Sequence, residues 1–508
     1  MEFYKDQLVT ATIEDMGKNG EGIGRVDGYT LFIKDTVIGD TVQAKIIKTK
    51  NSYGYARLMQ ILTPSAYRTD PPCAFARQCG GCQLQALSYP QQLLFKEKLV
   101  RGNLEHIGGC TDLPMEPIVG MDDPLHYRNK AQFPIGLDKN GRIVAGFYAG
   151  RTHQIIPNRD CLLGVPQNRQ VLDMVIAHME ERRIAPYDEA TGKGLVRHVL
   201  IRYGFQSGEI MVCLVINGKH LPHAENLTQK LSTLPGMASV TLNINRTRSN
   251  VILGEKTVLL WGRPYITDQI GDLHFHISPQ SFFQVNPQQT EKMYAKALEY
   301  AALTGEETVW DLYCGIGTIS LFLARAARKV YGVEIIPQAI QDARTNARLN
   351  HLENVEFSVG KAEEILPARY KDDRIEADVI VVDPPRKGCD KVLLDTILQV
   401  EPRRIVYVSC DSATLARDVK YLREGGYEVD RVCPFDNFPM TCHVETVVML
   451  SHKKPDSVIN VTVEFGEGEG KVPLDNIAKR AEAYKPKERV TYKMIKEYYR
   501  SEVWLQST

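Results

Sequence analysis

Residues 309–324, VWDLYCGIGTISLFLA, decide the fold of the C-terminal half of this chain. An apolar run typical of a β-strand ends in Gly315 and Gly317 and continues directly into a helical pattern. Glycines at a strand-to-helix turn let the backbone approach a ligand closely, and a helix N-terminus favours negative charge. We therefore interpret this stretch as a strand, loop and helix that can bind a nucleotide.

The residues that follow repeat this arrangement. Apolar runs of strand length alternate with helical stretches, at 309–313, 330–334, 355–359, 378–383 and 404–409. Such alternation is typical of an α/β domain with a doubly wound parallel sheet. Residues 443–450, HVETVVML, are predicted to close the sheet as an antiparallel edge strand.

The glycine loop indicates the size of its ligand. Glu334 ends the strand after the loop, where an acidic residue commonly binds ribose hydroxyls, although it could be an ordinary carboxylate at a strand end. The third glycine of the dinucleotide fingerprint is missing, which argues against NAD and favours a smaller adenosyl ligand such as S-adenosylmethionine. We assign Asp311, Gly315, Gly317 and Glu334 to this candidate cofactor site.

Three reactive side chains follow other predicted strands. Cys410 lies between a strand and a helix that starts near Ser412, and helix N-termini lower thiol pKa values, so Cys410 is a candidate nucleophile rather than a packing residue. Asp383, in VIVVDPPRKG, could accept the N3–H of a uracil or a hydroxyl of a cofactor. Glu445 is a candidate general base. Arg386 and Lys387 could bind phosphates, or form a solvated basic pair.

A second group of residues is rich in cysteine. Cys73, Cys79 and Cys82 form a C-x5-C-x2-C pattern, and Cys161 is the best candidate for a fourth ligand, with Cys110 as a weaker one. Four thiolates suit zinc or an iron–sulfur cluster, and the spacing does not decide between them. The chain has 11 cysteines, an odd number with uneven spacing, which argues against a disulfide framework.

The N-terminal half is predicted to contain two further domains. Residues 7–61 show short β-rich runs separated by glycine-rich turns, as in a small barrel of the OB type. This segment mixes basic and aromatic side chains as RNA-binding barrels do, although the same mixture can belong to a solvated face: Lys45, Lys48, Lys50, Tyr53, Tyr55 and Arg57. A helix is expected from Tyr89 to His106, and a central α+β domain with an antiparallel sheet at 120–270.

Composition limits the remaining possibilities. The 508 residues carry 62 Lys and Arg against 62 Asp and Glu, which excludes a globally basic, histone-like binder but allows a local basic patch. The N-terminus does not resemble a signal peptide, and no stretch approaches the ~20 apolar residues of a membrane span, so we expect a cytoplasmic protein, by default a monomer. The tail at 452–508 has short helical patterns at 476–485 and 492–502 and no evident chemistry.

Up to about residue 451 the chain resembles bacterial RNA uracil-5-methyltransferases that modify 23S ribosomal RNA. The resemblance rests on an N-terminal barrel of the kind called TRAM, the C-x5-C-x2-C pattern and six motifs in the expected order: YRNKAQFP, SFFQVN, DLYCGIG, VDPPRKG, SCDSATLARD and HVET. It implies a class I methyltransferase domain at 276–451, a TRAM barrel at 1–61, and a central domain at 62–88 and 111–275. The helix at 89–110 would then pack with the catalytic domain, and 452–508 would be an extension of unknown role.

The resemblance also implies roles for individual residues. Cys410 matches the family nucleophile and Glu445 the family base. S-adenosylmethionine contacts are expected from Gln284, Tyr313, Glu334 and Asp383, and a [4Fe–4S] cluster on Cys73, Cys79, Cys82 and Cys161. As a hypothesis, the Cys410 thiolate adds to carbon 6 of uracil, carbon 5 takes the methyl group, and Glu445 removes the carbon-5 proton. Candidate RNA contacts are Arg128, Lys130, Phe282, Arg386 and Lys387.

Two local departures and three alternatives accompany this interpretation. Asp411-Ser412 replaces an Asn-Pro common in the family, and Met440 replaces a histidine. A tRNA-specific relative generally lacks both the barrel and the cluster, so we expect ribosomal RNA as the substrate, with tRNA as the alternative. An exocyclic-amine methyltransferase would need no cysteine nucleophile, and a non-catalytic RNA-binding or ribosome-assembly protein would transfer no methyl group.

Overall fold

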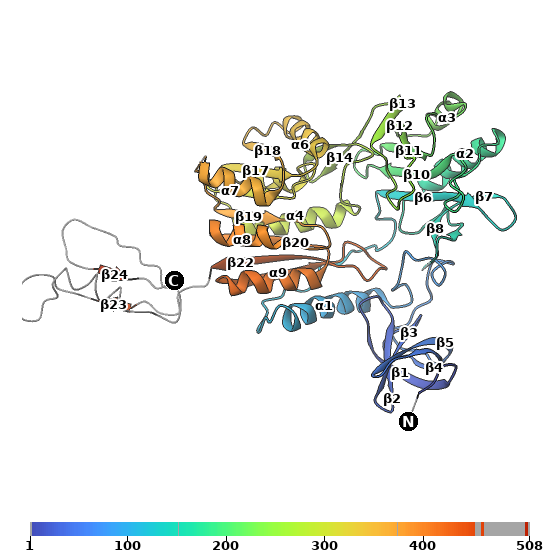
Figure 1. Ribbon diagram of the computed structural model, residues 1–508, viewed down its shortest axis with the longest axis horizontal. Coiled ribbons are helices and arrows are strands. Elements are labelled where there is room, and N and C mark those ends of the chain that lie inside the picture. Colours follow the sequence, from blue (N-terminus) through green and yellow to red (C-terminus); the bar gives the residue numbers. More distant parts are fainter. Residues whose placement is uncertain (1–2, 151, 373, 453–458, 462–502, 506–508) are drawn as a thin grey trace, which may run out of the picture.

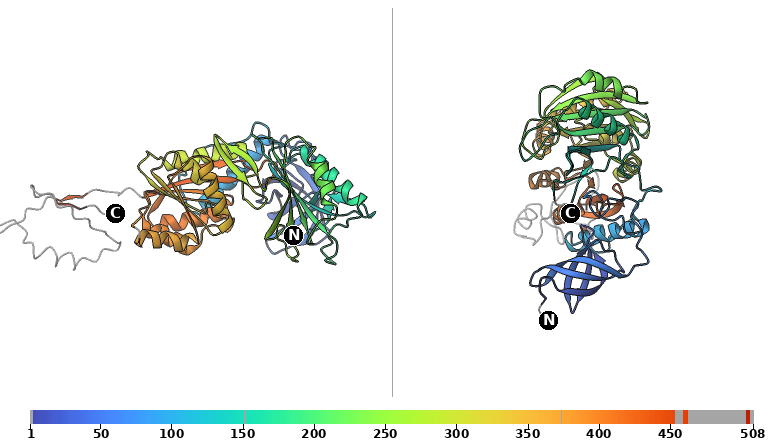
Figure 2. Two further views of the ribbon diagram at one scale, coloured as in Figure 1. Left: turned by 90° about the horizontal axis from the view of Figure 1, so that it is seen from above. Right: turned by 90° about the vertical axis from the view of Figure 1, so that its right-hand side faces the viewer.

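The computed structural model describes residues 3–150, 152–372, 374–452, 459–461 and 503–505. It shows a barrel, a central domain and a catalytic domain as three distinct bodies, with the barrel projecting from the other two (Figures 1 and 2). The helical patterns predicted at 476–485 and 492–502 lie outside the described residues. In the tail, β23 (Ile459–Val461) pairs antiparallel with β24 (Val503–Leu505).

The N-terminal body is a closed barrel with the strand order β1-β2-β3-β5-β4. Its strands are β1 (Leu8–Met16), β2 (Gly22–Val26), β3 (Tyr29–Lys34), β4 (Thr41–Thr49) and β5 (Tyr53–Thr63). Alternate side chains point into the barrel, so that Val9, Ala11 and Ile13 of β1 are buried between exposed neighbours. The structure confirms the predicted small barrel. Gly17 and Gly20 lie in the bend after β1, as predicted, whereas Gly22 and Gly24 belong to β2, where Thr36, Ile13 and the Thr12 carbonyl leave no room for a Cβ.

The central body is a mixed sheet covered on one face by helices. Its strand order is β13-β12-β11-β10-β6-β7. The elements are β6 (Lys130–Leu137), β7 (Ile143–Ala145), β10 (Val196–Tyr203), β11 (Ile210–Ile216), β12 (Met237–Ile244), β13 (Lys256–Gly262), α2 (Gln167–Glu181) and α3 (Ala224–Leu231). The prediction of an antiparallel sheet was wrong for β11 and β12, which pair parallel because α3 crosses between them.

Two short hairpins complete this part of the chain. One pairs β8 (Phe147–Tyr148) with β9 (Ile155–Ile156), and the other pairs β14 (Ile266–Ile270) with β15 (Leu273–Ile277). The second hairpin lies outside the central sheet, and β15 packs its apolar side chains against the catalytic domain.

The catalytic body is an α/β sandwich with the strand order β18-β17-β16-β19-β20-β22-β21. The strands are β16 (Thr308–Leu312), β17 (Lys329–Glu334), β18 (Val355–Val359), β19 (Val379–Val382), β20 (Arg404–Ser409), β21 (Tyr427–Phe435) and β22 (Glu445–His452). This confirms the predicted doubly wound α/β class. The HVETVVML run is antiparallel as expected, but the prediction that it forms the edge was wrong, because β21 pairs outside it.

Helices cover both faces of this sheet. One face is packed by α4 (Pro287–Ala301), α5 (Thr318–Ala324) and α6 (Pro337–Leu349). The other face is packed by α7 (Ala362–Asp372), α8 (Lys391–Val400), α9 (Ser412–Glu424) and α1 (Tyr89–His106). Helix α1 precedes the central domain in sequence, yet Val100 and Leu104 are buried in the catalytic core beside α9 (Figure 1).

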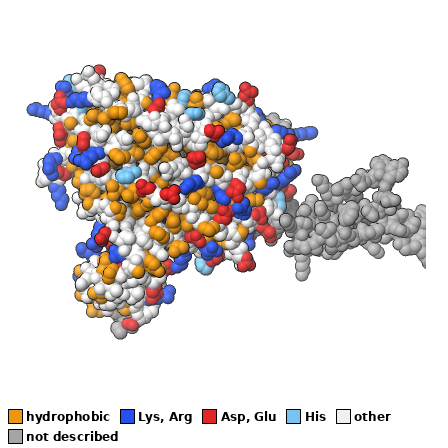
Figure 3. All heavy atoms as spheres, turned by 180° about the vertical axis from the view of Figure 1, so that it is seen from behind, with side chains coloured by type: hydrophobic (Ala, Val, Ile, Leu, Met, Phe, Trp, Pro, Cys, Tyr) orange, Lys and Arg blue, Asp and Glu red, His pale blue; other side chains and the backbone are white. Residues whose placement is uncertain are grey.

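The barrel is joined to the rest of the molecule through a small apolar cluster. Met16 and Val37 of the barrel pack against Leu84, Leu87 and Phe95. From behind, the barrel forms a separate lobe, and basic and acidic side chains are interspersed over the face in view (Figure 3). None of the described helices is both long and apolar enough to cross a membrane.

Candidate active site

The predicted catalytic side chains meet at one edge of the catalytic sheet. The parallel strands β16, β17, β19 and β20 end there, and β22 runs the opposite way and therefore begins there. Ser409, the last residue of β20, pairs with Thr446, so that Cys410 and Glu445 lie at neighbouring strand ends. Ligands bind at this edge in open α/β sheets.

The glycine loop is shaped for close approach of a ligand. The N–H groups of Tyr313 and Cys314 both donate to the Val333 carbonyl at 3.0 Å, which turns the chain sharply after β16. Tyr313, Gly315 and Gly317 all have left-handed φ values, +72°, +54° and +84°. A Cβ on Gly317 would lie 3.0 Å from the Phe357 ring, whereas one on Gly315 would point into open space. The loop thus leaves free volume above Gly315.

Glu334 is fixed to this loop by its carboxylate. One oxygen accepts from the Gly315 N–H at 3.3 Å and the other from the Ile336 N–H at 3.0 Å. The side chain is half-buried. Glu334 is therefore part of the loop's own structure as well as a carboxylate available at its rim.

Two aspartates carry negative charge beneath and beside the loop. Asp311 is completely buried in β16 and accepts from the Ser320 hydroxyl at 2.5 Å, which places it under the loop. Burial raises the pKa of Asp311 to about 7, and Glu334 raises it further. Burial and the nearby Asp311 likewise raise the pKa of Asp383 to about 7. Such crowding of carboxyl groups favours a positively charged ligand.

The surroundings of Cys410 differ from the sequence-based prediction. Burial, together with the carboxyl groups of Glu445 and Asp383, raises the pKa of the Cys410 thiol to about 12, and Arg386 acts in the opposite direction. We predicted that the N-terminus of α9 would lower this pKa. The same helix end is capped by the Asp411 side chain, which accepts from the N–H groups of Ala413 and Thr414, both at 3.0 Å.

Glu445 has the environment of a general base. It is 2% exposed, at the start of β22 opposite Phe435. Burial raises its pKa to about 8, with a further increase from Asp383 and a decrease from Arg386. A buried carboxylate whose pKa lies near neutrality accepts a proton more readily than an exposed one.

The SFFQVN motif forms a loop held by the central domain. Asn129 donates from its side chain to the Gln284 carbonyl at 2.8 Å and from its backbone to Val285 at 2.9 Å. Gln284 is buried, and Phe282 is 66% exposed. Phe283, the next residue, is packed in the core.

The four cysteines predicted as ligands line one cavity of about 280 Å³. Cys110 does not reach it, because it is buried among the apolar side chains between α1 and the catalytic sheet. Arg128 and Lys130, predicted as RNA contacts, line this same cavity. Within the described part of the chain, no three His, Cys, Asp or Glu side chains are grouped closely enough to hold a metal ion.

The barrel presents basic and aromatic side chains in adjacent rows. Across strands, Tyr55 lies beside Phe32 and Lys48, and Arg57 lies beside Lys34 and Lys45. The rings of Phe32, Tyr53 and Tyr55 contact one another at 5.6 to 5.8 Å between centroids. Lys45 is partly neutralised by Asp6 at 3.0 Å. This face has the composition of a surface on which nucleic-acid bases stack.

Sequence reasoning missed two polar residues that support the site. Gln92 and Lys96 are fully buried on the same face of α1 as Val100 and Leu104. The i, i+4, i+8, i+12 spacing of these four residues was the signal that could have identified them.

Two family models match the chain. One, described as tRNA (Uracil-5-)-methyltransferase, matches residues 119–453, and the other, the TRAM domain, matches residues 2–59. The chain is 50% identical over 450 residues to an uncharacterized RNA methyltransferase of Halalkalibacterium halodurans, a match that covers 88% of this chain and 98% of the relative. A similar protein of Clostridium tetani is 46% identical over 449 residues, 88% of this chain and 97% of that one.

A solved structure is also similar over most of the chain. It is the tRNA (uracil-54, C5)-methyltransferase of Pyrococcus abyssi in complex with S-adenosyl-L-homocysteine. The two share 28% sequence identity with a TM-score of 0.69, and the match covers 87% of this chain and 99% of that one.

Proposed function

Because the chain belongs to the tRNA (uracil-5-)-methyltransferase family, we propose that it methylates carbon 5 of a uridine in 23S ribosomal RNA through a covalent bond to Cys410. The observation that carries this proposal is the meeting of Cys410, Asp383, Glu445 and Arg386 beside the glycine loop. A thiol, a buried base and a further carboxylate at one sheet edge match the requirements of this reaction.

The thiol solves a problem of reactivity. Carbon 5 of uracil is too weak a nucleophile to attack a methyl sulfonium unaided. Addition of the Cys410 thiolate to carbon 6 forms a C–S bond and moves an electron pair to carbon 5 and the O4 enolate. Carbon 5 then takes the methyl group from S-adenosylmethionine, which leaves as S-adenosylhomocysteine.

Glu445 completes the cycle by accepting a proton. Removal of the carbon-5 proton by the Glu445 carboxylate restores the C5=C6 double bond and expels the Cys410 thiolate. Because Glu445 is buried with a pKa near 8, this transfer takes place away from bulk water. Asp383 is placed to accept the N3–H of the uracil or a cofactor hydroxyl.

The acidic edge fits S-adenosylmethionine, which supplies an electrophilic methyl group on a cationic sulfonium. Asp311, Asp383 and Glu445 all have raised pKa values, so that a bound cation relieves their mutual repulsion. We propose that Glu334 at the loop rim binds ribose hydroxyls and that Gln284, Tyr313, Gly315 and Gly317 form the remaining contacts.

The RNA must bring its target base out of the stack to reach Cys410. Phe282 is exposed enough to stack on a displaced base, and Arg386 and Lys387 are exposed at the mouth of the site. Arg128 and Lys130 line the cysteine cavity, so a phosphate contact from them would have to form there. The aromatic and basic face of the barrel would bind flanking nucleotides.

Ribosomal RNA is our first candidate for the substrate because the chain has both the TRAM barrel and the cysteine pattern. A tRNA uridine is the second candidate, favoured by the similarity to the Pyrococcus abyssi enzyme, which extends over 87% of this chain. A cytoplasmic location and a monomeric state stay predictions.

We further propose that Cys73, Cys79, Cys82 and Cys161 bind a [4Fe–4S] cluster, with zinc as the less favoured occupant. Their shared cavity supports this assignment, and four thiolates are the usual donor set.

The reaction is tested by methyl transfer from labelled S-adenosylmethionine to unmodified 23S ribosomal RNA and to tRNA, with the labelled nucleoside identified and mapped. We expect 5-methyluridine in ribosomal RNA. Label in tRNA alone would support uridine methylation but contradict ribosomal RNA as the substrate. No label in either RNA, despite binding of both partners, would favour a non-catalytic RNA-binding protein.

The two catalytic residues are tested by substitutions with opposite outcomes. Cys410→Ala should abolish turnover and adduct formation on 5-fluorouridine RNA while S-adenosylhomocysteine still binds. Glu445→Gln should accumulate a methylated covalent RNA adduct, because the bond to Cys410 forms but elimination needs the base. Full methylation by Cys410→Ala, or rapid product release by Glu445→Gln, would contradict these roles.

The cysteine site is tested by the visible spectrum and by iron, sulfide and zinc analysis of anaerobically purified protein. We expect about four iron atoms and four sulfides per chain, lost in Cys161→Ser and retained in Cys110→Ser, the matched control. One zinc per chain would show that the four cysteines bind zinc instead of an iron–sulfur cluster. Equal loss of metal in Cys161→Ser and Cys110→Ser would contradict the assignment of Cys161 as a ligand.

A further inference from the structure

The candidate base is carried by a turn that is unusually well anchored. Residues 436–444 connect β21 to β22, and the pair Phe435–Glu445 closes the hairpin. Glu445 is therefore the first residue after this turn. The position of this turn therefore determines the backbone position from which the Glu445 side chain extends.

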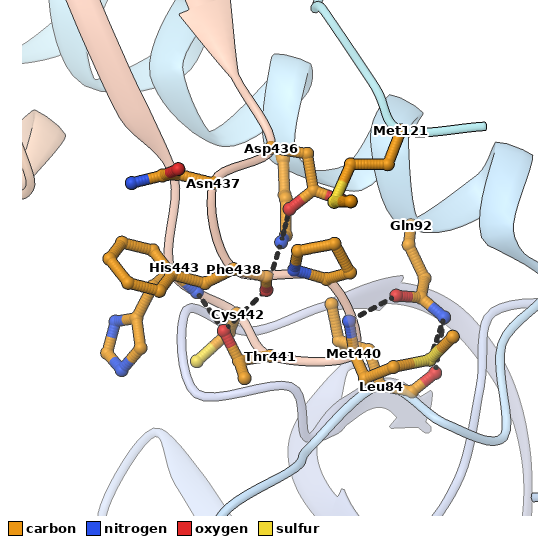
Figure 4. Close-up of polar contacts among 12 residues, drawn as sticks. Leu84, Gln92, Met121, Asp436, Asn437, Phe438, Met440, Thr441, Cys442 and His443 are labelled. Carbon is orange, nitrogen blue, oxygen red and sulfur yellow. Dashed lines mark hydrogen bonds and ion pairs between the residues drawn. The ribbon is translucent and has the colours of Figure 1, made fainter. Parts of the chain in front are cut away.

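Two buried polar side chains of α1 bind the turn. Lys96 forms an ion pair with Asp436, and its Nζ also donates to the Phe438 carbonyl at 2.9 Å. One helical turn earlier, the Gln92 side chain accepts from the Met440 N–H at 3.1 Å (Figure 4). All of these side chains are buried, so the bonds form without competition from water.

Gln92 also binds the segment that follows the cysteine loop. Its Nε2 donates to the carbonyls of Leu84 at 3.1 Å and Leu87 at 2.8 Å, and it contacts the Met440 sulfur at 3.3 Å. The backbone N–H groups of Gln83 and Leu84 in turn both donate to the Met440 carbonyl, at 3.1 and 3.0 Å. The residues directly after Cys82 are thus bonded to the turn that leads to Glu445.

Met440 is the point where these segments meet. Its φ of +67° lies in the left-handed region that non-glycine residues rarely adopt. Both its N–H and its carbonyl are engaged, by Gln92 on one side and by Gln83 and Leu84 on the other. The packing around it includes Cys82 and Cys161 from the cysteine cavity. Such a conformation persists only when the surroundings determine it.

We propose that Gln92 is a positioning residue for the candidate base: it fastens the end of the cysteine loop to the 436–444 turn and thereby sets the place of Glu445. The assignment of a base to Glu445 rests on the proposed function, and the hydrogen-bonded link itself does not. An apolar side chain at position 92 would fill the same space but make none of the Gln92 hydrogen bonds, so that of the bonds described here only the backbone bonds from Gln83 and Leu84 to Met440 would join the two segments.

The link is tested directly by hydrogen–deuterium exchange of the full-length protein. In Gln92→Met, which keeps the side-chain length, amide exchange over 436–445 should be on the order of tenfold faster, because the Met440 N–H loses its acceptor. Gln91→Met, on the same turn of α1 but with a side chain that is only half-buried, is the matched control and should exchange like the wild type. Unchanged exchange in Gln92→Met would overturn the link.

The consequence for catalysis is tested by the fate of the covalent RNA adduct. Gln92→Met should bind S-adenosylhomocysteine normally and form the adduct, but release product on the order of tenfold more slowly, since small displacements of a catalytic group are costly. Gln92→Glu, which keeps an acceptor for the Met440 N–H, should recover part of the release rate. Release at the wild-type rate by Gln92→Met, or joint loss of cofactor binding and adduct formation, would overturn the positioning role. A wild-type protein that forms no adduct would instead refute the proposed function.

Discussion

Charge around single residues determines what the candidate site can do. Cys410 is surrounded by carboxyl groups that oppose its ionisation, and Arg386 is the cation that favours it. The same arginine lowers the pKa of Glu445. In the proposed mechanism both groups must lose a proton before they can act, Cys410 as nucleophile and Glu445 as base. Arg386 therefore helps both steps, although we predicted it only as a phosphate contact.

Replacing Arg386 should shift the pH dependence of catalysis. Without its positive charge the pKa values of Cys410 and Glu445 both rise, so their active, deprotonated forms appear at higher pH. We expect the rise of kcat with pH to move upward by about half a unit or more in Arg386→Gln, a shift typical of loss of a nearby charge.

Single-turnover rates between pH 6 and 9.5 would measure this shift. Lys387→Gln, which removes an equal charge from the next residue of the same exposed loop, is the control. If both variants shift alike, the effect belongs to RNA binding rather than to Cys410 and Glu445.

The candidate site residues at strand ends could be predicted from the sequence, whereas the residues that surround and position them could not. Asp383 and Cys410 could be placed together because parallel strands bring their carboxyl ends to one edge. The pKa of Cys410 could not be foreseen, since it depends on Glu445 and Asp383, which are close to it only in the fold. The spacing within α1 could have placed Gln92 on the buried face, but nothing local indicates that its partner would be Met440, more than 340 positions later.

At the scale of elements, helix α9 shows how a local substitution acts. Asp411 stands where the family often has asparagine, and it caps α9 through the N–H groups of Ala413 and Thr414. Asp411→Ala should lower the free energy of unfolding by about 1 kcal/mol, the usual cost of losing such a cap. It should also reduce activity, because the cap lies next to Cys410.

Chemical denaturation with and without S-adenosylhomocysteine would measure this cost. Asp411→Asn keeps the oxygen that caps the helix and should recover most of the stability. It removes only the negative charge, which interacts favourably with the positive N-terminal end of the helix. An equal loss in both variants would show that the charge, not the cap, stabilises this junction.

Long apolar elements were easier to predict than mixed ones. The strands β16 and β19 are fully buried, β20 is buried after its first residue, and the sequences of all three are mainly apolar. The edge strand β21, YEVDRVCPF, has charged residues through its middle, and so its sequence does not distinguish it from a loop. The β-barrel closes through pairing of β1 with β4, a contact that no local pattern specifies.

For the molecule as a whole, the barrel and the catalytic domain should contribute separately to RNA binding. Tyr55 is 37% exposed and lies beside Phe32 and Lys48, so a base can stack on it. Tyr55→Ala should weaken RNA binding about tenfold, within the 1–3 kcal/mol attributed to one stacked base. The affinity for S-adenosylhomocysteine should not change.

Equilibrium RNA binding and cofactor titration of the same preparations would check this separation. Tyr4→Ala removes another exposed tyrosine near the barrel's N-terminus and serves as the control. A parallel loss of cofactor affinity in Tyr55→Ala would show that the barrel acts through the fold rather than through RNA.

The burial of α1 against the catalytic sheet has a consequence for synthesis of the chain. Lys96 and Asp436 are 340 residues apart, so at about 5–20 residues per second the ribosome adds Asp436 roughly 17 to 70 s after Lys96. During that interval Val100, Leu104 and the Lys96 ammonium have no catalytic sheet to cover them. The packing of α1 against its sheet is therefore a late event in the synthesis of the chain, because it waits for Asp436 to be added.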